Sequence, residues 1–262
     1  MLLAINVGNN DITAGVFDGE APVCSFCIGA AYGKSADEYA VLLRDMLEFK
    51  GCCYKEITES VIGSVVPTLT DTVRSAVTLL CSVYPLVVGP GVKTGFRIML
   101  NDPVELGADL AANAVGAISE FGAPVIVCDI GTVTSVNAVD GDKAFRGGAI
   151  FPGVGLSLDA LGEAELLPAV CAEKPTSPLG KNTVECMNAG VIYGQAAALS
   201  FFISAYEKEL GLSTDTPVVV TGKYADKMSE YLDARVEYRP LLTLRGLCAI
   251  ARINGKKQRC CR

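Results

Sequence analysis

The stretch LLAINVGNN at residues 2–10 recurs as VIVCDIGTVT at residues 125–134, and this repeat decides the fold. In each copy an apolar run typical of a buried strand leads into a polar turn that contains glycine. Each copy continues into a second short strand, residues 12–17 and 135–139, and each of these ends in an Asp-Gly pair typical of a hairpin turn. A strand, a turn, a strand and a hairpin turn therefore occur twice, which predicts two lobes of the same architecture.

The residues around the two copies alternate between strand and helix patterns, which is the order of an α/β protein. We expect further strands near residues 24–28, 61–66, 85–88 and 217–220, and helices over residues 35–49, 68–81, 108–120, 182–207 and 242–253. Ser35 and Glu38 have the spacing of a capping box, and Gly51 is the expected stop of that helix. We predict an N-terminal lobe over residues 1–115 and a C-terminal lobe over 116–262.

The composition restricts the chemistry. The chain has 262 residues and no His, so it has no imidazole base, no Ser-His-Asp triad and no His-ligated metal. Acid–base work must fall to carboxylates, Lys, Tyr or Cys. The 22 basic and 29 acidic residues give a net charge of −7, which argues against nucleic acid or an anionic membrane as the main partner.

Most of the 11 Cys residues are expected to be free thiols in a reducing cytoplasm, because the N-terminal residues have no pattern of a secretory signal. Cys24 and Cys27 form a CxxC, but on a strand they point to opposite faces, so packing is the preferred interpretation. The Cys spacings give no zinc pattern, and we expect no membrane span.

The two turns could cradle phosphate with their backbone N–H groups, while the side chain at the strand end holds a cation. The alternative is an ordinary hairpin with a polar loop; the duplication favours a ligand. GGAIFPG at residues 147–153 is either a ligand-approach loop or a simple turn, and GPGVKTG at 89–95 lacks the spacing of a Walker A motif. Asp109 opens a helix, where it either complements the helix dipole or acts as a general base.

Seven motifs in order give the chain a resemblance to the type III pantothenate kinases, which belong to the superfamily of acetate and sugar kinases, Hsp70 and actin. The motifs are NVGNN (6–10), GPGVKTG (89–95), DPVELGAD (102–109), DIGTVTS (129–135), GGAIFPG (147–153), GKNTVECMNAG (180–190) and LLTLRGL (241–247). The resemblance implies two duplicated actin-like (ribonuclease H-like) lobes with an ATP cleft between them. It also implies ATP-dependent phosphorylation of pantothenate, the first step of coenzyme A synthesis, by a cytoplasmic homodimer that uses Mg²⁺ and a monovalent cation, K⁺ or NH₄⁺.

The resemblance also implies roles for particular residues. Asp109 would be the catalytic base, and Asp129 would hold the monovalent cation. The residues expected at ATP are Asn6, Gly8, Asn9, Asn10, Asp11, Ile12, Gly131, Thr132 and Thr134. The residues expected at pantothenate are Gly107, Ala108, Asp109, Leu110 and Thr183, the last contributed by the partner subunit.

Three positions depart from the family pattern. Asn6 stands where the family has Asp, and Leu110 stands where the family has an Arg that holds the pantothenate carboxylate. The basic, Thr-containing run expected before Pro168 is replaced by residues 162–167, GEAELL. A second hypothesis is therefore a catalytically weakened nucleotide-binding or regulatory protein, similar to the Bvg accessory factors.

Overall fold

The computed structural model describes residues 1–232 and 235–258. The chain divides into two compact units. The first holds residues 1–96, 101–119 and the C-terminal segment from Leu242, and the second holds residues 97–100 and 120–241.

The first unit is built on a five-stranded sheet in the order β3-β2-β1-β4-β5. Its strands are β1 (Leu2–Val7), β2 (Asp11–Asp18), β3 (Ala21–Gly29), β4 (Glu59–Ser64) and β5 (Leu86–Val87). The three strands β1, β2 and β3 form an antiparallel meander, whereas β4 pairs parallel with β1, and β5 parallel with β4.

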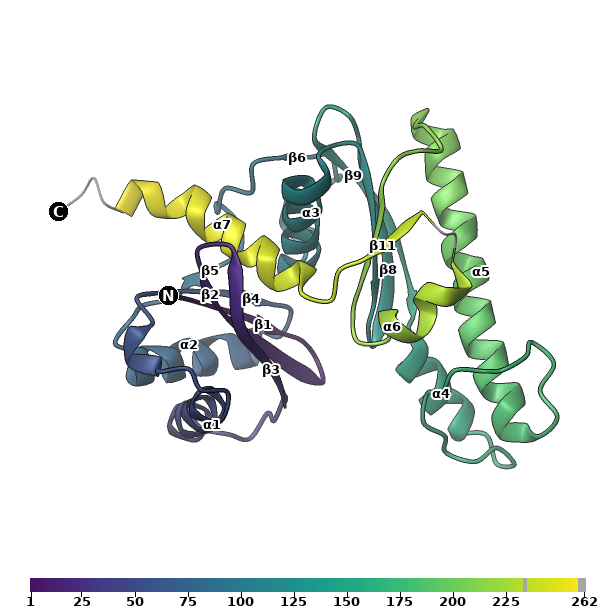
Figure 1. Cartoon of the computed structure of the whole chain (residues 1–262), viewed down its shortest axis with the longest axis horizontal. Helices are drawn as coiled ribbons and strands as arrows, with labels where there is room; N and C mark the ends of the chain where they lie inside the picture. Colours follow the sequence, from purple (N-terminus) through teal and green to yellow (C-terminus); the bar gives the residue numbers. More distant parts are fainter. Residues whose placement is uncertain (233–234, 259–262) are drawn as a thin grey trace. The chain divides into compact units, whose positions relative to one another are not determined.

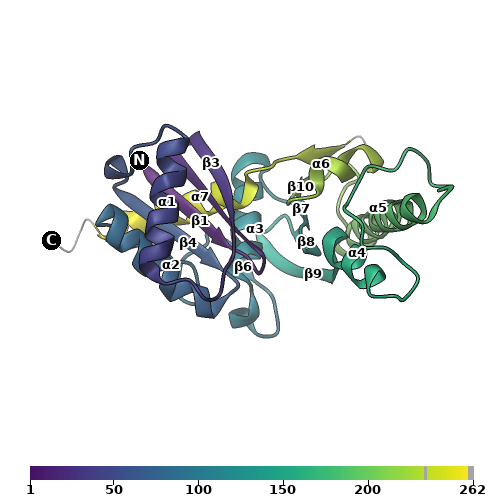
Figure 2. The ribbon, with the colours of Figure 1, turned by 90° about the horizontal axis from the view of Figure 1, so that it is seen from below.

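Helices cover both faces of this sheet. Both views show α1 (Ala36–Phe49) and α2 (Pro67–Cys81) on one face and α7 (Leu242–Gln258) on the opposite face (Figures 1 and 2). Alternation along β1 sends Leu3, Ile5 and Val7 into the core with α1 and α2, which turns Asn6 toward the face of α7. The unit is completed by α3 (Ala108–Phe121) and the short 3-10 turns η1 (Tyr54–Glu56) and η2 (Pro103–Glu105).

The crossing of α3 and α7 is tight because small residues line it. A Cβ placed on Gly246 would stand 1.8 Å from the carbonyl oxygen of Ala112, and one on Gly116 would stand 2.8 Å from that of Leu242. The Thr243 hydroxyl donates to Asn113 Oδ1 over 2.7 Å across the same crossing. Backbone approach of this kind is possible only where side chains are absent.

The second unit repeats the arrangement in a six-stranded sheet of order β11-β10-β7-β8-β9-β6. Its strands are β6 (Arg97–Ile98), β7 (Val125–Ile130), β8 (Val133–Val139), β9 (Ala144–Pro152), β10 (Val218–Thr221) and β11 (Val236–Tyr238). Its helices are α4 (Val154–Gly162), α5 (Thr183–Leu210) and α6 (Ala225–Met228), followed by η3 (Ser229–Tyr231). Strands β7 to β11 thus reproduce the order of β1 to β5, and the predicted duplicated α/β fold is confirmed.

The unit boundaries differ from the predicted lobes. The predicted boundary between residues 115 and 116 falls inside α3, and the C-terminal helix, assigned to the second lobe, packs on β1 and β4 of the first unit. The chain leaves the first unit and returns to it, which a division by sequence position does not detect.

The glycine-rich stretch at residues 147–153 is mostly strand rather than loop. Residues up to Pro152 belong to β9, which pairs with β8 and with β6. Gly148 is required there because a Cβ would stand 2.0 Å from the carbonyl oxygen of Val136. Glycine in this strand reflects close backbone packing, which looks like a loop when only the sequence is known.

Candidate functional site

The first group of predicted site residues lies at the start of α3. Gly107 precedes the helix, Ala108 and Asp109 form its first turn, and Leu110 follows. The side chain of Asp109 folds back so that its Oδ1 accepts the N–H of Leu110 over 2.8 Å. A Cβ on Gly107 would stand 2.6 Å from the same oxygen, so a glycine at this position leaves the carboxylate its space.

Burial raises the pKa of the Asp109 carboxyl above its ordinary value, and the N–H of Leu110 offsets this only in part. A carboxylate with a raised pKa holds a proton more readily, which is the property of a general base. Leu110 is half-buried and has no polar side-chain atom, so its side chain offers nothing to an anionic substrate group.

The second group is the turn between β1 and β2. The N–H of Gly8 donates to the carbonyl oxygen of Asp11 over 2.9 Å, which closes the turn, while Asn9 and Asn10 are exposed at its tip. The Tyr32 hydroxyl donates to the carbonyl oxygen of Asn9, and the N–H of Ala30 to that of Asn10.

Not every residue expected at this turn has a side chain available. Ile12 is fully buried in the core of the first unit, so only its main chain can contact a ligand. Asn9 and Asn10, by contrast, are exposed residues with side-chain amides, a residue type that suits phosphate recognition.

Asn6 lies at the end of β1, opposite Gly63 of β4. Its Oδ1 is buried and has no hydrogen-bond partner among the described residues. A Cβ on Gly63 would stand 2.9 Å from the Leu247 side chain and 3.6 Å from Asn6 Oδ1, which places Asn6 beneath α7. An unpaired buried carbonyl oxygen lowers the stability of a fold. Such a hard oxygen is also a suitable ligand atom for Mg²⁺, or an acceptor of hydrogen bonds from its water shell.

The third group is the turn between β7 and β8, which two glycines support. The N–H of Gly153 donates to the carbonyl oxygen of Thr132 over 3.0 Å, and a Cβ on Gly153 would stand 2.3 Å from the carbonyl oxygen of Gly131. Gly222 has φ +103°, and a Cβ there would stand 2.5 Å from Oδ1 of Asp129. The Asp129 carboxylate is therefore packed against backbone.

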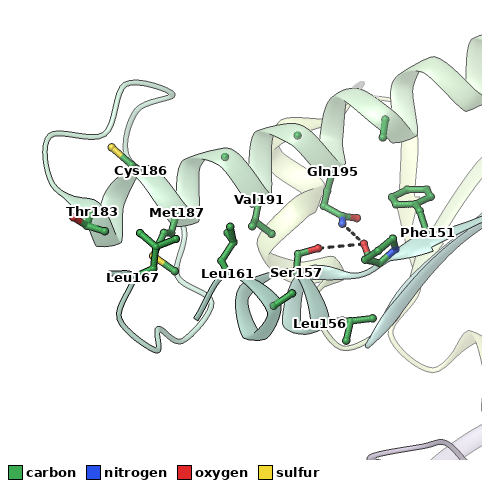
Figure 3. A pocket seen from close by; sticks show the side chains of 15 residues that line it. Phe151, Leu156, Ser157, Leu161, Leu167, Thr183, Cys186, Met187, Val191 and Gln195 are labelled. Atoms are coloured by element: carbon green, nitrogen blue, oxygen red, sulfur yellow. Dashed lines mark hydrogen bonds between the residues drawn. The ribbon is translucent and has the colours of Figure 1, made fainter. Parts of the chain in front are cut away.

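Thr134 has a role that the sequence did not indicate. It is fully buried, and its hydroxyl donates to Oε1 of Gln195 on α5 over 2.9 Å. Gln195 in turn donates its Nε2 to the carbonyl oxygen of Pro152 (Figure 3). The Thr134 side chain is thus committed to α5 rather than turned to a ligand, and Gln195 is a supporting residue that sequence reasoning missed. The only indication was an amide among apolar residues in a helix.

A cavity of about 980 Å³ lies in the second unit between α4, α5 and the end of β9 (Figure 3). Its lining is mainly apolar, and Thr183 at the start of α5 lies at one end. Of all the predicted site residues, only Thr183 lines this cavity.

Metal-ligating side chains and long apolar helices bear on the sequence predictions. Among the residues that the structure describes, no three His, Cys, Asp or Glu side chains gather in a way that could hold a metal ion. In the same part of the chain α5 is long and apolar enough to cross a membrane by length and composition, but half of its most apolar window is buried within the protein.

Comparison with known proteins gives one family. A model of the family described as type III pantothenate kinase matches residues 2–205. A type III pantothenate kinase from Moorella thermoacetica is 40% identical and covers 94% of this chain and 97% of its own. Those from Shouchella clausii and Agathobacter rectalis are 41% and 37% identical and cover 94% and 98% of this chain, and 97% and 99% of their own.

Solved structures agree on the fold. A protein from Sinorhizobium meliloti described as a 2-dehydro-3-deoxygalactonokinase superposes with a TM-score of 0.59 at 12% identity, covering 97% of this chain and 96% of that one. A protein from Campylobacter jejuni described as a Baf family transcriptional activator superposes with a TM-score of 0.58 at 16% identity, covering 97% and 99%. At these identities the likeness concerns the actin-like fold alone.

Proposed function

The chain belongs to the type III pantothenate kinase family, and from this premise we propose that it transfers the γ-phosphoryl group of ATP to the hydroxyl of pantothenate, the first step of coenzyme A synthesis. The observation that carries the proposal is the family match over residues 2–205. ATP and a divalent metal ion are accordingly its co-substrate and cofactor. Catalysis of phosphoryl transfer depends mainly on positioning and electrostatic stabilisation.

Asp109 is the base in this proposal. It would accept the proton of the pantothenate hydroxyl as that oxygen attacks phosphorus. Support comes from its burial, from the raised pKa of its carboxyl, and from the space that Gly107 leaves beside Oδ1. Because the base must be ionised, turnover should rise as the pH increases through that raised pKa.

The test is Asp109→Asn, measured as ADP release with and without pantothenate. The amide cannot accept the proton, so pantothenate-dependent turnover should fall by about 100-fold or more. Because the pKa of Asp109 is raised in the folded state, ionisation of this carboxyl lowers the free energy of unfolding of the parent as pH rises through that pKa. The amide variant does not ionise, so it should be at least as stable as the parent at neutral pH. Asp71→Asn on α2, where the carboxylate is exposed, is the control. Turnover within a few-fold of the parent would remove Asp109 from this role.

The two turns would hold the nucleotide and its metal ion. Gly8 to Ile12 would contact phosphate, and Gly131 and Thr132 the nucleotide, with Thr134 supporting that turn from within. Asn6 Oδ1 suits the water shell of Mg²⁺ because it is a hard oxygen with no other described partner. When bound, Mg²⁺ supplies positive charge to the transferring phosphoryl group.

Asp129 would hold the monovalent cation, K⁺ or NH₄⁺. Its carboxylate ends a buried strand and is confined by the backbone at Gly222, so it supplies a fixed negative charge. Asp129→Ala should remove activation by added K⁺ or NH₄⁺, measured as turnover against salt at constant ionic strength. Equal activation of variant and parent would place the cation elsewhere.

A homodimer in which Thr183 reaches the partner's pantothenate site completes the proposal. Support comes from α5, which carries Thr183, lines the apolar cavity and leaves Phe201 exposed over 66% of its surface. An apolar helix face of this kind is typical of an interface. The family's place in coenzyme A synthesis and the free thiols favour a cytoplasmic protein.

Mixing two variants tests the shared site. If Thr183 acts across the interface, an Asp109→Asn subunit paired with a Thr183→Ala subunit forms one intact site. Equal amounts, unfolded and refolded together, should recover about a quarter of parental turnover, because half of the dimers are mixed and each has one intact site of two. Recovery no greater than the mean of the two variants would show that Thr183 acts within its own subunit or not at all.

A further inference from the structure

Two cysteines meet inside the first unit, away from every residue used above. The thiol of Cys52 donates to Sγ of Cys24, and the two sulfur atoms are 2.8 Å apart. Cys52 is 5% exposed and Cys24 is half-buried, and both lie against the core under α1 and α2.

The backbone fixes both thiols. Cys52 follows the end of α1, where the N–H of Cys52 donates to Leu47 O and the N–H of Gly51 to Glu48 O, both over 2.9 Å. With Gly51 at φ +73° this is a Schellman motif, which defines the chain direction after the helix. Cys24 is held in β3 opposite Val16, next to an irregularity in the pairing of β2 and β3.

We propose that Cys24 and Cys52 form a redox modification site, which a peroxide converts to a disulfide that joins β3 to the end of α1. Cys24 sulfur attacks one peroxide oxygen, the O–O bond breaks and water leaves, giving a sulfenic acid. Cys52 sulfur attacks that sulfur, the S–O bond breaks and a second water leaves with the remaining proton. The two thiols lose two electrons in total, and the peroxide oxygens are reduced to water.

The neighbouring thiols are not equivalent. Cys27 is exposed on the opposite face of β3, and Cys53 is exposed beside Cys52. Burial, and then Cys52, raise the pKa of the Cys24 thiol to about 12. The reduced pair is therefore protonated and reacts slowly with a peroxide. Once one of the two sulfurs is oxidised, however, the other is the thiol nearest to it among these four cysteines.

The bond would close the chain over residues 24–52, a loop that contains the whole of α1. A cross-link of this kind removes conformational freedom from the unfolded chain, so it stabilises the folded first unit. Reduction by a thiol reverses it.

The experiment uses the full chain with Cys27→Ser and Cys53→Ser. Trypsin then yields peptides 1–34 and 51–55 with one thiol each, Cys24 and Cys52. Reduced protein is treated with hydrogen peroxide, remaining thiols are alkylated under denaturing conditions, and the digest is analysed by mass. We expect the two peptides joined, at the mass of their sum less two hydrogens, separable by dithiothreitol, and a melting temperature raised by about 5 °C.

The proposal would be overturned if the two peptides were recovered as separate chains with their thiols alkylated or over-oxidised. This test leaves Cys24 and Cys52 themselves unsubstituted. Cys24→Ser in the parent chain gives an independent check. In this variant Cys52 should remain open to alkylation after peroxide. A link between the same two peptides that persists in Cys24→Ser would assign the reaction to Cys27 and likewise overturn the proposal.

Discussion

The β1–β2 turn and the β7–β8 turn occupy the same place in two sheets of the same order, but they are held in different ways. Residues 8–11 form the first turn, and Tyr32 and Ala30 both hydrogen-bond to its exposed tip. Residues 131–133 form the second, and it is supported from beneath by backbone at Gly153 and Gly222. Duplication has preserved the strand order and replaced the local support.

The residues near the ends of β1 and β7 also differ in charge and in what surrounds them. Asn6 is a neutral amide with an unpaired oxygen under α7, whereas Asp129 is a carboxylate packed against Gly222. The second strand end is therefore charged and confined by backbone, whereas the first is neutral and lies under a flexible side chain. Four substitutions test this difference.

The largest effect is expected for Gly222→Ala. The new methyl group would overlap both Asp129 Oδ1 and the backbone of Ile130, at a φ of +103° that alanine rarely adopts. We expect a loss of about 3 kcal/mol in the free energy of unfolding and a fall in turnover of more than about 100-fold. Gly63→Ala, whose methyl group would meet the flexible Leu247 side chain at 2.9 Å and Asn6 Oδ1 at an ordinary contact distance of 3.6 Å, should cost about 1 kcal/mol in urea unfolding. Equal losses at the two positions would contradict the proposed difference in support.

A smaller effect is expected for Gln195→Leu, which leaves the Thr134 hydroxyl without its Gln195 partner. Among the side-chain hydrogen bonds of the described residues, the Pro152 carbonyl oxygen then keeps only the long 3.4 Å bond from the Ser157 hydroxyl. The cost should be about 2 kcal/mol, with a rise in KM for ATP larger than the change in kcat. Thr134→Val together with Gln195→Leu should recover part of the stability, because both buried polar groups are then removed. A strictly additive double variant would show that the two side chains do not act together.

Asn6→Asp makes the first strand end resemble the second. Mg²⁺ should support turnover at about tenfold lower concentration, because the metal gains a formal negative charge. Without Mg²⁺ the variant should be less stable by about 1 to 2 kcal/mol, because a buried carboxylate lacks a partner there. Melting curves with and without Mg²⁺ measure both. A variant that gains neither Mg²⁺ affinity nor Mg²⁺-dependent stability would show that Asn6 does not face the metal.

The smallest effect is expected for Tyr32→Phe, which removes the hydroxyl that donates to Asn9 at the tip of the first turn. Tyr32 is 62% exposed, so stability should change by about 0.5 kcal/mol or less, and KM for ATP by about two- to threefold. A change as large as that of Gln195→Leu would mean that the first turn is as firmly supported as the second.

The sequence predicted most of the fold because its signals were local. The capping box of Ser35 and Glu38 is present at the start of α1, and Gly51 ends that helix in a left-handed conformation. Strands β6, β9 and β11 and helix α4 were not predicted. Gly147 and Gly148 made β9 look like a loop. Gly148 is needed because a Cβ there would stand 2.0 Å from the carbonyl oxygen of Val136 on the paired strand β8, a contact that the local sequence does not reveal.

The predictions for the candidate site also depended on whether the interacting residues are close in sequence. Gly107 and Asp109 are close because they are close in sequence, and their roles in the site stay predictions. Thr134 was expected at the nucleotide, but its side chain bonds Gln195, which is 61 residues away. A hydroxyl in a turn motif looks the same in sequence whether it faces a ligand or a distant helix.

The return of α7 to the first unit has a consequence for synthesis of the protein. Residues 97–241, which include every strand and helix of the second unit, are synthesised before residue 242 is added. The face of the first sheet that carries Gly15 and Gly63 stays uncovered until Leu244 and Leu247 have been added. The N-terminal half of the chain is therefore the last to be finished, and a premature stop near the C-terminus would damage the unit that begins at Met1.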